Sequence, residues 1–300
     1  MEDSKYSPGA RGFHRRGAAA APGTCGELVQ GTQKGIPFLV TCPVDWWSEV
    51  AVGQNEGTAS LPVPSRKMKE AVRAVQLKYN NCRDPFPLLS KTSTIPLGKG
   101  MSSSTADIAA ACLAASRYWG REMKSEEIME VAISIEPSDG NMFSGIHLLD
   151  HRGGSWSESL GDPPSLGLLV IDPGGEVDTL AFNSRSQLLS LYGQKEQQTS
   201  KALRLVREGI KENDEEKIGR GATISAESNQ EILPKKELGQ VFYYAQEIKA
   251  WGVNVAHSGT VLGIIMPPVQ EFLEEAAFWI SSRQKHWQLY GTFLIPGGVR

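Results

Sequence analysis

The amino-acid sequence predicts an α+β fold built from two halves of similar size. Segments with helical spacing of apolar residues alternate with short β-branched and aromatic segments along the chain. Residues 151–165 are dense in Gly, Ser and Pro, which is typical of a linker. The length of 300 residues is enough for two ordinary domains. We therefore expect a loose tail over residues 1–17, an N-terminal domain over 18–160 and a C-terminal domain over 161–300.

The elements of the first half follow from turn residues and hydrophobic spacing. Pro and Gly interrupt the strands, and apolar positions three and four residues apart, such as Met68, Val72 and Val75, indicate helices. In chain order we expect a Gly-rich turn region over 22–35, strands over 36–40 and 47–52, a helix over 65–79, a strand over 90–95, and helices over 105–119 and 125–136.

The second half alternates helices with short apolar strands and contains no internal repeat. Its first strand follows directly on the linker candidate. In chain order we expect a strand over 166–171, helices around 200–209, 215–231, 236–251 and 270–282, and strands near 253, over 263–266 and over 290–295.

Composition and charge exclude several classes of protein. Lys and Arg total 31 against 34 Asp and Glu, a net charge of −3 with both signs spread along the chain, so we expect no nucleic-acid partner. The sequence has neither an apolar run of membrane-spanning length nor a signal peptide, so we expect no membrane partner and a cytoplasmic location. The 4 cysteines form no C-x-x-C pair and are expected to be reduced thiols.

The segment from Gly98 to Asp107, GKGMSSSTAD, carries the strongest chemical signal. Its glycines allow close backbone approach, its serines offer hydroxyls, Lys99 adds a cation, and the following helix directs free N–H groups at the loop. These are the parts of an anion site, which favours nucleotide binding. The alternative is a plain helix start, because Ser104 and Asp107 have capping-box spacing. Both interpretations hold if one serine caps the helix and another binds phosphate.

Two familiar nucleotide motifs are absent. The loop lacks the Gly and Ser/Thr spacing of a Walker A motif, and no G-x-G-x-x-G stands at a strand–helix junction. A P-loop NTPase and a Rossmann dehydrogenase are therefore disfavoured.

Two further clusters gain meaning only in combination. Glu136 and Asp139 lie three apart on a Pro/Gly turn, where one carboxylate can bind Mg²⁺ and the other can take a proton from a hydroxyl. The alternative is a turn with solvated acids. The Gly-rich segment 257–263 can close over a phosphate or simply join two strands.

Together these segments resemble the GHMP kinases. Residues 96–106 resemble that family's phosphate loop, Ala21–Glu27 its first motif, the Glu136/Asp139 turn its central acidic segment, and residues 258–263 its Gly-rich third motif. Within the family, Pro22–Gly31, Cys42–Trp46, Gly98–Ala109 and Asn254–Gly259 look like the branch of L-threonine kinases in cobalamin synthesis.

The resemblance implies a fold, a reaction and a set of ligands. The fold is a ribosomal-S5-like N-terminal domain followed by a ferredoxin-like C-terminal domain. The reaction is phosphoryl transfer from ATP, with Mg²⁺, to the hydroxyl of L-threonine, giving O-phospho-L-threonine for the aminopropanol linker of cobalamin. Another hydroxylated metabolite such as homoserine, or a non-catalytic nucleotide sensor, is the alternative.

The resemblance also assigns roles to residues. Asp139 is the catalytic base, and Glu136 with Ser104, or Ser103, binds the metal. Asp45 is our candidate for the ammonium of threonine, and a strand-turn acid without function is the alternative there. The expected nucleotide contacts are Pro96, Gly98, Lys99, Gly100, Met101, Ser102, Ser103, Ser104, Thr105, Ser258 and Gly259.

One position departs from the family pattern. Mevalonate-type members carry a Lys after the Pro-Gly of the first motif, and this chain has Thr24. The resemblance therefore leaves Asp139 without the lysine partner that it has in those kinases.

Overall fold

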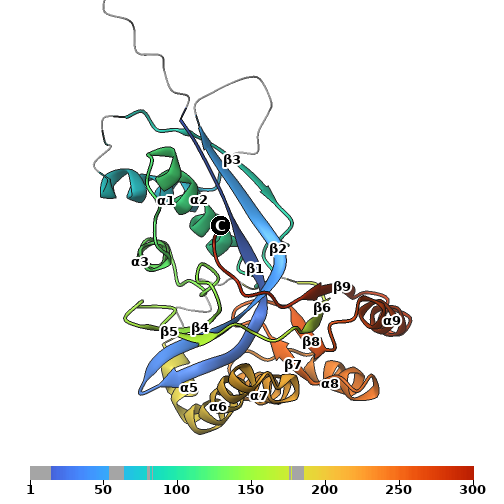
Figure 1. The fold of residues 1–300 in the computed structure, drawn as a ribbon. Coiled ribbons are helices and arrows are strands. Elements are labelled where there is room, and N and C mark those ends of the chain that lie inside the picture. The colour runs from blue at the N-terminus through green and yellow to red at the C-terminus, as the bar shows by residue number, and fades with distance from the viewer. Residues whose placement is uncertain (1–14, 54–63, 80–81, 83, 176, 178–185) are drawn as a thin grey trace, which may run out of the picture.

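An antiparallel sheet runs through both halves of the chain in the computed structural model, which describes residues 15–53, 64–79, 82, 84–175, 177 and 186–300. Within these residues the sheet has nine strands, in the order β5-β4-β2-β1-β7-β8-β6-β9, with β3 paired to β2 (Figure 1). The strands are β1 (Arg16–Gln33), β2 (Ile36–Gly53), β3 (Leu88–Ser93), β4 (Ile146–Leu149), β5 (Ser157–Gly161), β6 (Gly167–Asp172), β7 (Gly252–Val255), β8 (Leu262–Met266) and β9 (Gln288–Phe293).

The helices cover the sheet in two groups. In Figure 1, α1, α2 and α3 lie beside the upper parts of β1 and β2, whereas α5 to α8 lie across the lower part and α9 stands at the far edge. The helices are α1 (Arg66–Lys78), α2 (Ser103–Tyr118), α3 (Ser125–Ile135), α5 (Leu188–Gln194), α6 (Glu196–Glu212), α7 (Glu215–Asn229), α8 (Leu238–Glu247) and α9 (Gln270–Ser281). The mixture of helices with an antiparallel sheet confirms the α+β prediction.

Most of the region expected as a Gly-rich turn over 22–35 instead belongs to β1, which runs to Gln33, so this prediction was wrong except at Lys34 and Gly35, which form the turn into β2. β2 pairs with almost the full length of β1, and shifts in register at Pro22/Gly23 and on either side of Glu27 accommodate the Pro and Gly residues as bulges. β2 is likewise one strand where two were expected. β1 also pairs with β7 through Glu27 and Val255, which joins the first half of the sheet to the second.

The linker expected over 151–165 contains a strand. Residues 157–161 form β5, which pairs with β4 at the edge of the sheet. Hydrogen bonding to a neighbouring strand has prevailed over the local Gly, Ser and Pro content. Arg16 and Gly17, expected in the tail, already belong to β1, and residues 1–14 lie outside the described part. The domain boundary near 160 stays a prediction.

The core follows the hydrophobic spacing of the sequence. Met68, Val72 and Val75 of α1 are buried as their spacing predicts, and Ser65 caps that helix by accepting from the Met68 N–H at 3.2 Å. α2 is buried almost along its whole length against β1 and β2, because its many alanines allow close packing. This packing fixes where the N-terminus of α2 points.

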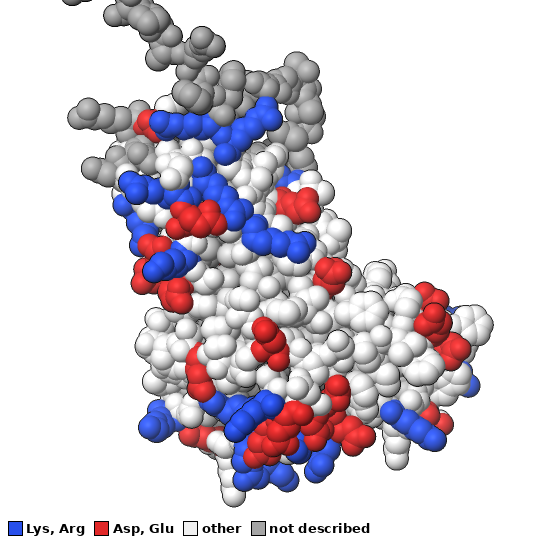
Figure 2. All heavy atoms as spheres, in the orientation of Figure 1, with Lys and Arg blue, Asp and Glu red and all other residues white. Residues whose placement is uncertain are grey.

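Charged side chains of both signs stand next to one another on the face shown in Figure 2, with a mostly uncharged band across its middle. This mixture agrees with the small net charge of −3. None of the helices in the described residues is long and apolar enough to cross a membrane.

Candidate active site

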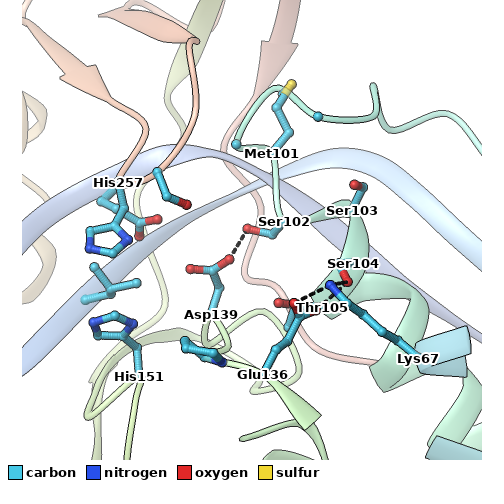
Figure 3. A pocket seen from close by; sticks show the side chains of 16 residues that line it. Lys67, Met101, Ser102, Ser103, Ser104, Thr105, Glu136, Asp139, His151 and His257 are labelled. Carbon is cyan, nitrogen blue, oxygen red and sulfur yellow. Dashed lines mark hydrogen bonds and ion pairs between the residues drawn. The ribbon is translucent and has the colours of Figure 1, made fainter. Parts of the chain in front are cut away.

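A cavity of about 300 Å³ opens at the N-terminus of α2, between elements of both halves (Figure 3). Its walls carry most of the residues that the sequence singles out. The lining residues are Glu27, Leu39, Lys67, Gly98, Gly100, Met101, Ser102, Ser103, Ser104, Thr105, Glu136, Pro137, Asp139, His151, His257 and Ser258. The phosphate loop, the acidic turn and the third Gly-rich segment thus meet at one place.

Backbone contacts from both sides hold the loop before α2. The Thr260 and Val261 N–H groups donate to the Lys99 carbonyl at 3.0 and 3.3 Å. A Cβ added at Gly259 would lie 2.2 Å from the Gly100 Cα, so the two backbones touch where neither residue has a side chain. The two loops therefore form one unit.

The helix start differs from the capping box expected at Ser104. α2 begins at Ser103, and Ser102 precedes it in the left-handed region, at φ 54°, without a side-chain cap. Asp107 points elsewhere and accepts from Ser48 Oγ at 2.6 Å and Lys91 Nζ at 2.5 Å. The capping prediction was wrong because Ser104 and Asp107 each form tertiary contacts. The first N–H groups of α2 are left without a side-chain acceptor, as an anion site requires.

Glu136 forms the first of two acidic centres. It ends α3 and accepts hydrogen bonds from Ser104 Oγ and from Lys67 Nζ, the latter at 2.5 Å, while Lys67 Nζ also lies 3.2 Å from Ser104 Oγ (Figure 3). A cationic group therefore already contacts both the hydroxyl and the carboxylate. These hard oxygen ligands fit Mg²⁺. The described residues contain no cluster of three His, Cys, Asp or Glu side chains that could hold a metal, so further ligands would have to be nucleotide oxygens and water.

Asp139 forms the second acidic centre. Its carboxylate accepts from Ser102 Oγ, and Ser102 Oγ lies 2.6 Å from Thr24 Oγ1 (Figure 3). Burial raises the pKa of Asp139 to about 6, against the lowering effect of the Ser102 hydrogen bond. A carboxyl with this pKa is mostly ionised at neutral pH and can accept a proton from a hydroxyl.

Glu27 brings a third carboxyl to the cavity from β1. It is 3% exposed, and its carboxyl adjoins that of Asp139. Burial, and then the charge of Asp139, raise the pKa of Glu27 well above its usual value. The raised pKa favours the protonated form of Glu27 beside Asp139.

Two buried histidines form the opposite wall. The rings of His151 and His257 meet edge to face with centroids 4.8 Å apart (Figure 3). Burial lowers the pKa of His151 to about 3 and that of His257 well below its usual value, so both rings are neutral. They give this side of the cavity an aromatic, uncharged surface.

Four predicted site residues lie outside the cavity lining. Pro96 precedes the loop, and Gly259 supports it from behind. Lys99 points away, toward Asp172 at 3.1 Å and the Gly175 carbonyl at 3.0 Å. Asp45 is exposed and accepts from Trp47 Nε1 at 2.6 Å. The roles given to these residues from the sequence stay predictions, and the geometry gives Lys99 and Asp45 no direct support.

Sequence reasoning missed two charged residues of the cavity. Lys67 lies near the start of α1, in a helix that reads as an ordinary amphipathic segment. Glu27 belongs to the quoted first motif, but nothing in the sequence shows that β1 brings it to Asp139. Thr24 stands at the family's lysine position and contacts Asp139 only through Ser102.

Comparison with known sequences agrees with this geometry. The family model for the GHMP kinases N terminal domain matches residues 66–149. An L-threonine kinase from Salmonella typhimurium is 32% identical over 287 residues, which cover 94% of this chain and 94% of that protein. An L-threonine kinase from Citrobacter freundii is 30% identical over 286 residues, which cover 94% of this chain and 98% of that protein.

Solved structures show the same fold. A homoserine kinase from Cytophaga hutchinsonii has a TM-score of 0.67 at 17% identity and covers 99% of both chains. A mevalonate diphosphate decarboxylase from Enterococcus faecalis has a TM-score of 0.68 at 17% identity, covering 96% of this chain and 99% of that one. A third neighbour, MDDEF in complex with MVAPP, AMPPCP and magnesium, has a TM-score of 0.67 at 17% identity. The match covers 96% of this chain and 99% of that one. The chain belongs to the GHMP kinase family, and the curated relatives that it resembles over nearly its whole length are L-threonine kinases.

Proposed function

We propose that this chain transfers the γ-phosphoryl group of ATP to the side-chain hydroxyl of L-threonine, giving O-phospho-L-threonine and ADP. The phosphoryl-transfer part is supported by one observation above all, the partly buried Asp139 carboxylate hydrogen-bonded to Ser102 at the edge of the phosphate loop. The choice of acceptor is supported by the names of the two curated relatives. The match extends over at least 94% of the length of each relative.

Different residues of the cavity would bind the phosphates, accept the proton and hold the metal. The loop from Gly98 to Ser104 and the N-terminus of α2 would bind the phosphates. Asp139 would accept the proton of the threonine hydroxyl as that oxygen bonds to the γ-phosphorus, and the bond to the ADP oxygen breaks with its electron pair leaving on ADP. Ser104 and Glu136 would hold Mg²⁺, which would supply charge neutralisation on the phosphate oxygens. Lys67 would give up its place beside Glu136 and remain near enough to pair with a phosphate.

A panel of acceptors tests the proposal. The purified protein is incubated with ATP and Mg²⁺ and with L-threonine, L-serine, L-homoserine or D-threonine, and the product is identified by phosphorus NMR. We expect O-phospho-L-threonine to form with the highest kcat/KM. Strong activity with L-homoserine and none with L-threonine would reassign the acceptor. ATP binding without turnover of any acceptor would contradict a kinase function.

A further inference from the structure

Glu27 is the least explained polar group in the cavity. Its side chain is 3% exposed, and its Oε2 atom is buried without a hydrogen-bond partner among the described residues. It lines the cavity beside Asp139, so this oxygen belongs to the site and not to the packed core. A buried acceptor left unpaired costs about 1–3 kcal/mol, and a bound group that donates to it would recover that cost.

Two of the three carboxyl groups in the cavity have no Lys or Arg of the described residues beside them. Lys67 neutralises Glu136 at 2.5 Å, but no Lys or Arg of the described chain forms a salt bridge with Glu27 or Asp139. The other titratable groups near them are neutral histidines, His151 and His257, and the buried thiols of Cys25 and Cys42. Two adjoining carboxyls without a counter-ion attract a positively charged ligand.

The covalent geometry of the acceptor places its ammonium at this point. In threonine the amino group and the hydroxyl are on adjacent carbons, so the nitrogen lies roughly 3 Å from the hydroxyl oxygen when the two groups are gauche. A hydroxyl that gives its proton to Asp139 must lie within hydrogen-bond distance of that carboxylate. The ammonium is then within reach of the carboxyl that adjoins Asp139, which is Glu27.

We propose that Glu27 binds the α-ammonium group of the acceptor amino acid through its otherwise unpaired Oε2 atom. This inference rests on the proposed function, because it requires an amino-acid acceptor whose hydroxyl reaches Asp139. It replaces Asp45 as the ammonium ligand. It also favours amino acids with the hydroxyl on the carbon next to the ammonium-bearing one over homoserine, in which one more carbon separates the two groups.

Binding of the ammonium has a measurable consequence for protons. In the empty cavity burial and Asp139 raise the pKa of Glu27, which favours its protonated form. A bound ammonium favours the ionised form of Glu27, so L-threonine binding should release protons to the buffer. Titration calorimetry in buffers of different ionisation enthalpy counts them.

The decisive experiment compares two ligands on two variants. L-threonine and its deaminated analogue, (R)-3-hydroxybutyrate, are titrated into the full chain in the presence of Mg²⁺ and a non-hydrolysable ATP analogue. For the unmodified protein we expect tighter binding of L-threonine and release of protons. For Glu27→Gln we expect L-threonine affinity to fall about 10- to 100-fold, the value of a hydrogen bond to a charged group. Affinity for the analogue should change less than about threefold, and proton release should disappear.

Several outcomes would overturn the inference. They are an unchanged L-threonine affinity in Glu27→Gln, an equal loss for both ligands, which indicates a merely structural role, or a selective loss in Asp45→Asn instead. Gln has the size of a protonated Glu, and thermal unfolding checks that the variant folds. If it does not, Glu27→Asp is used, which must keep a preference for L-threonine over the analogue. If the acceptor panel names a different amino acid, the proposed acceptor fails separately, and the same comparison is made with that amino acid and its deaminated analogue.

Discussion

At Asp139, burial and hydrogen bonding act on one carboxyl in opposite directions. Burial raises its pKa, the Ser102 hydroxyl lowers it, and the result is about 6. In the mevalonate-type members that the sequence resembles, a lysine would stand near this carboxyl, whereas here Thr24 reaches it through Ser102. A base without a cationic partner keeps a pKa closer to neutrality, and this affects how the reaction depends on pH.

The pH dependence follows from the sign of that shift. Asp139 must be ionised to accept a proton, and because its pKa is raised to about 6, the reactive form is present above that pH and lost below it. We expect kcat/KM for the acceptor to fall about tenfold per pH unit below the pKa.

Asp139→Asn should lower kcat by roughly 10²–10⁴ with little change in ATP affinity. A kcat within tenfold of the unmodified protein would remove Asp139 as the base.

A second prediction at the scale of residues concerns Lys67 and the affinity of the site for a divalent cation. The Lys67 ammonium pairs with Glu136, which we propose as a metal ligand, so in the absence of nucleotide we expect it to compete with the metal for that carboxylate. Lys67 is 39% exposed, and a half-exposed ion pair contributes about 1 kcal/mol. We therefore expect Lys67→Met to bind Mn²⁺ alone roughly fivefold more tightly, measured by electron paramagnetic resonance.

The matched control for this measurement is Glu136→Gln, which removes the carboxylate and should bind Mn²⁺ more weakly than the unmodified protein. Weaker binding in Lys67→Met would show that the lysine supports the metal site and does not compete with it.

At the scale of elements, α2 connects the core to the cavity. Its N-terminus carries the loop serines, and Asp107, one turn further on, joins the helix to β2 through Ser48 and to β3 through Lys91. The largely buried ion pair thus holds in place the same helix whose first N–H groups we propose to bind the phosphates. A change inside α2 should be felt both in stability and at the site.

Asp107→Ala tests this coupling. Removing one partner of a buried pair leaves Lys91 and Ser48 uncompensated, and we expect a loss of roughly 3 kcal/mol of unfolding free energy in urea titrations. Glu70→Ala is the control, since its pair with Arg66 lies on the exposed face of α1 and should cost less than about 0.5 kcal/mol. Equal losses in the two variants would contradict a special role for Asp107.

The elements also show which structure can be predicted from the sequence. The helix α1 and the strand β6 agree with their spacing, because local hydrophobic periodicity determines them. β1 and β5 were misread, because their Gly and Pro residues favour turns locally while pairing with distant strands dominates. Likewise the loop serines and the acidic turn were found from the sequence, whereas Glu27 and Lys67 reach the site only through tertiary packing.

At the scale of the whole molecule, the two halves share one sheet and one site. β1 lies between β2 and β7 in the sheet and so joins the two halves. Residues 259–261 of the second half contact the loop at Gly100. His151 from the first half and His257 from the second meet in one wall of the same cavity. Nucleotide affinity should therefore depend on residues that no phosphate touches.

Gly259→Ala tests this dependence. The added Cβ would lie 2.2 Å from the backbone of Gly100 and Lys99, so the loops must separate. We expect affinity for a fluorescent ATP analogue to fall at least about tenfold, since misplacement of a binding loop by about 1 Å can have such effects. Gly239→Ala is the control, because nothing lies within 4 Å of its added Cβ and it is inside α8. It should raise stability by roughly 0.5–1 kcal/mol without changing that affinity.

The touching backbones of Gly100 and Gly259 also restrict how the gene can change. A single-base change from Gly to Ala at either codon places a methyl group against main chain, and a second such change at the other codon adds to the clash instead of relieving it. A substitution at one glycine therefore cannot compensate for a substitution at the other. We expect proteins that retain nucleotide binding through this loop to have both glycines.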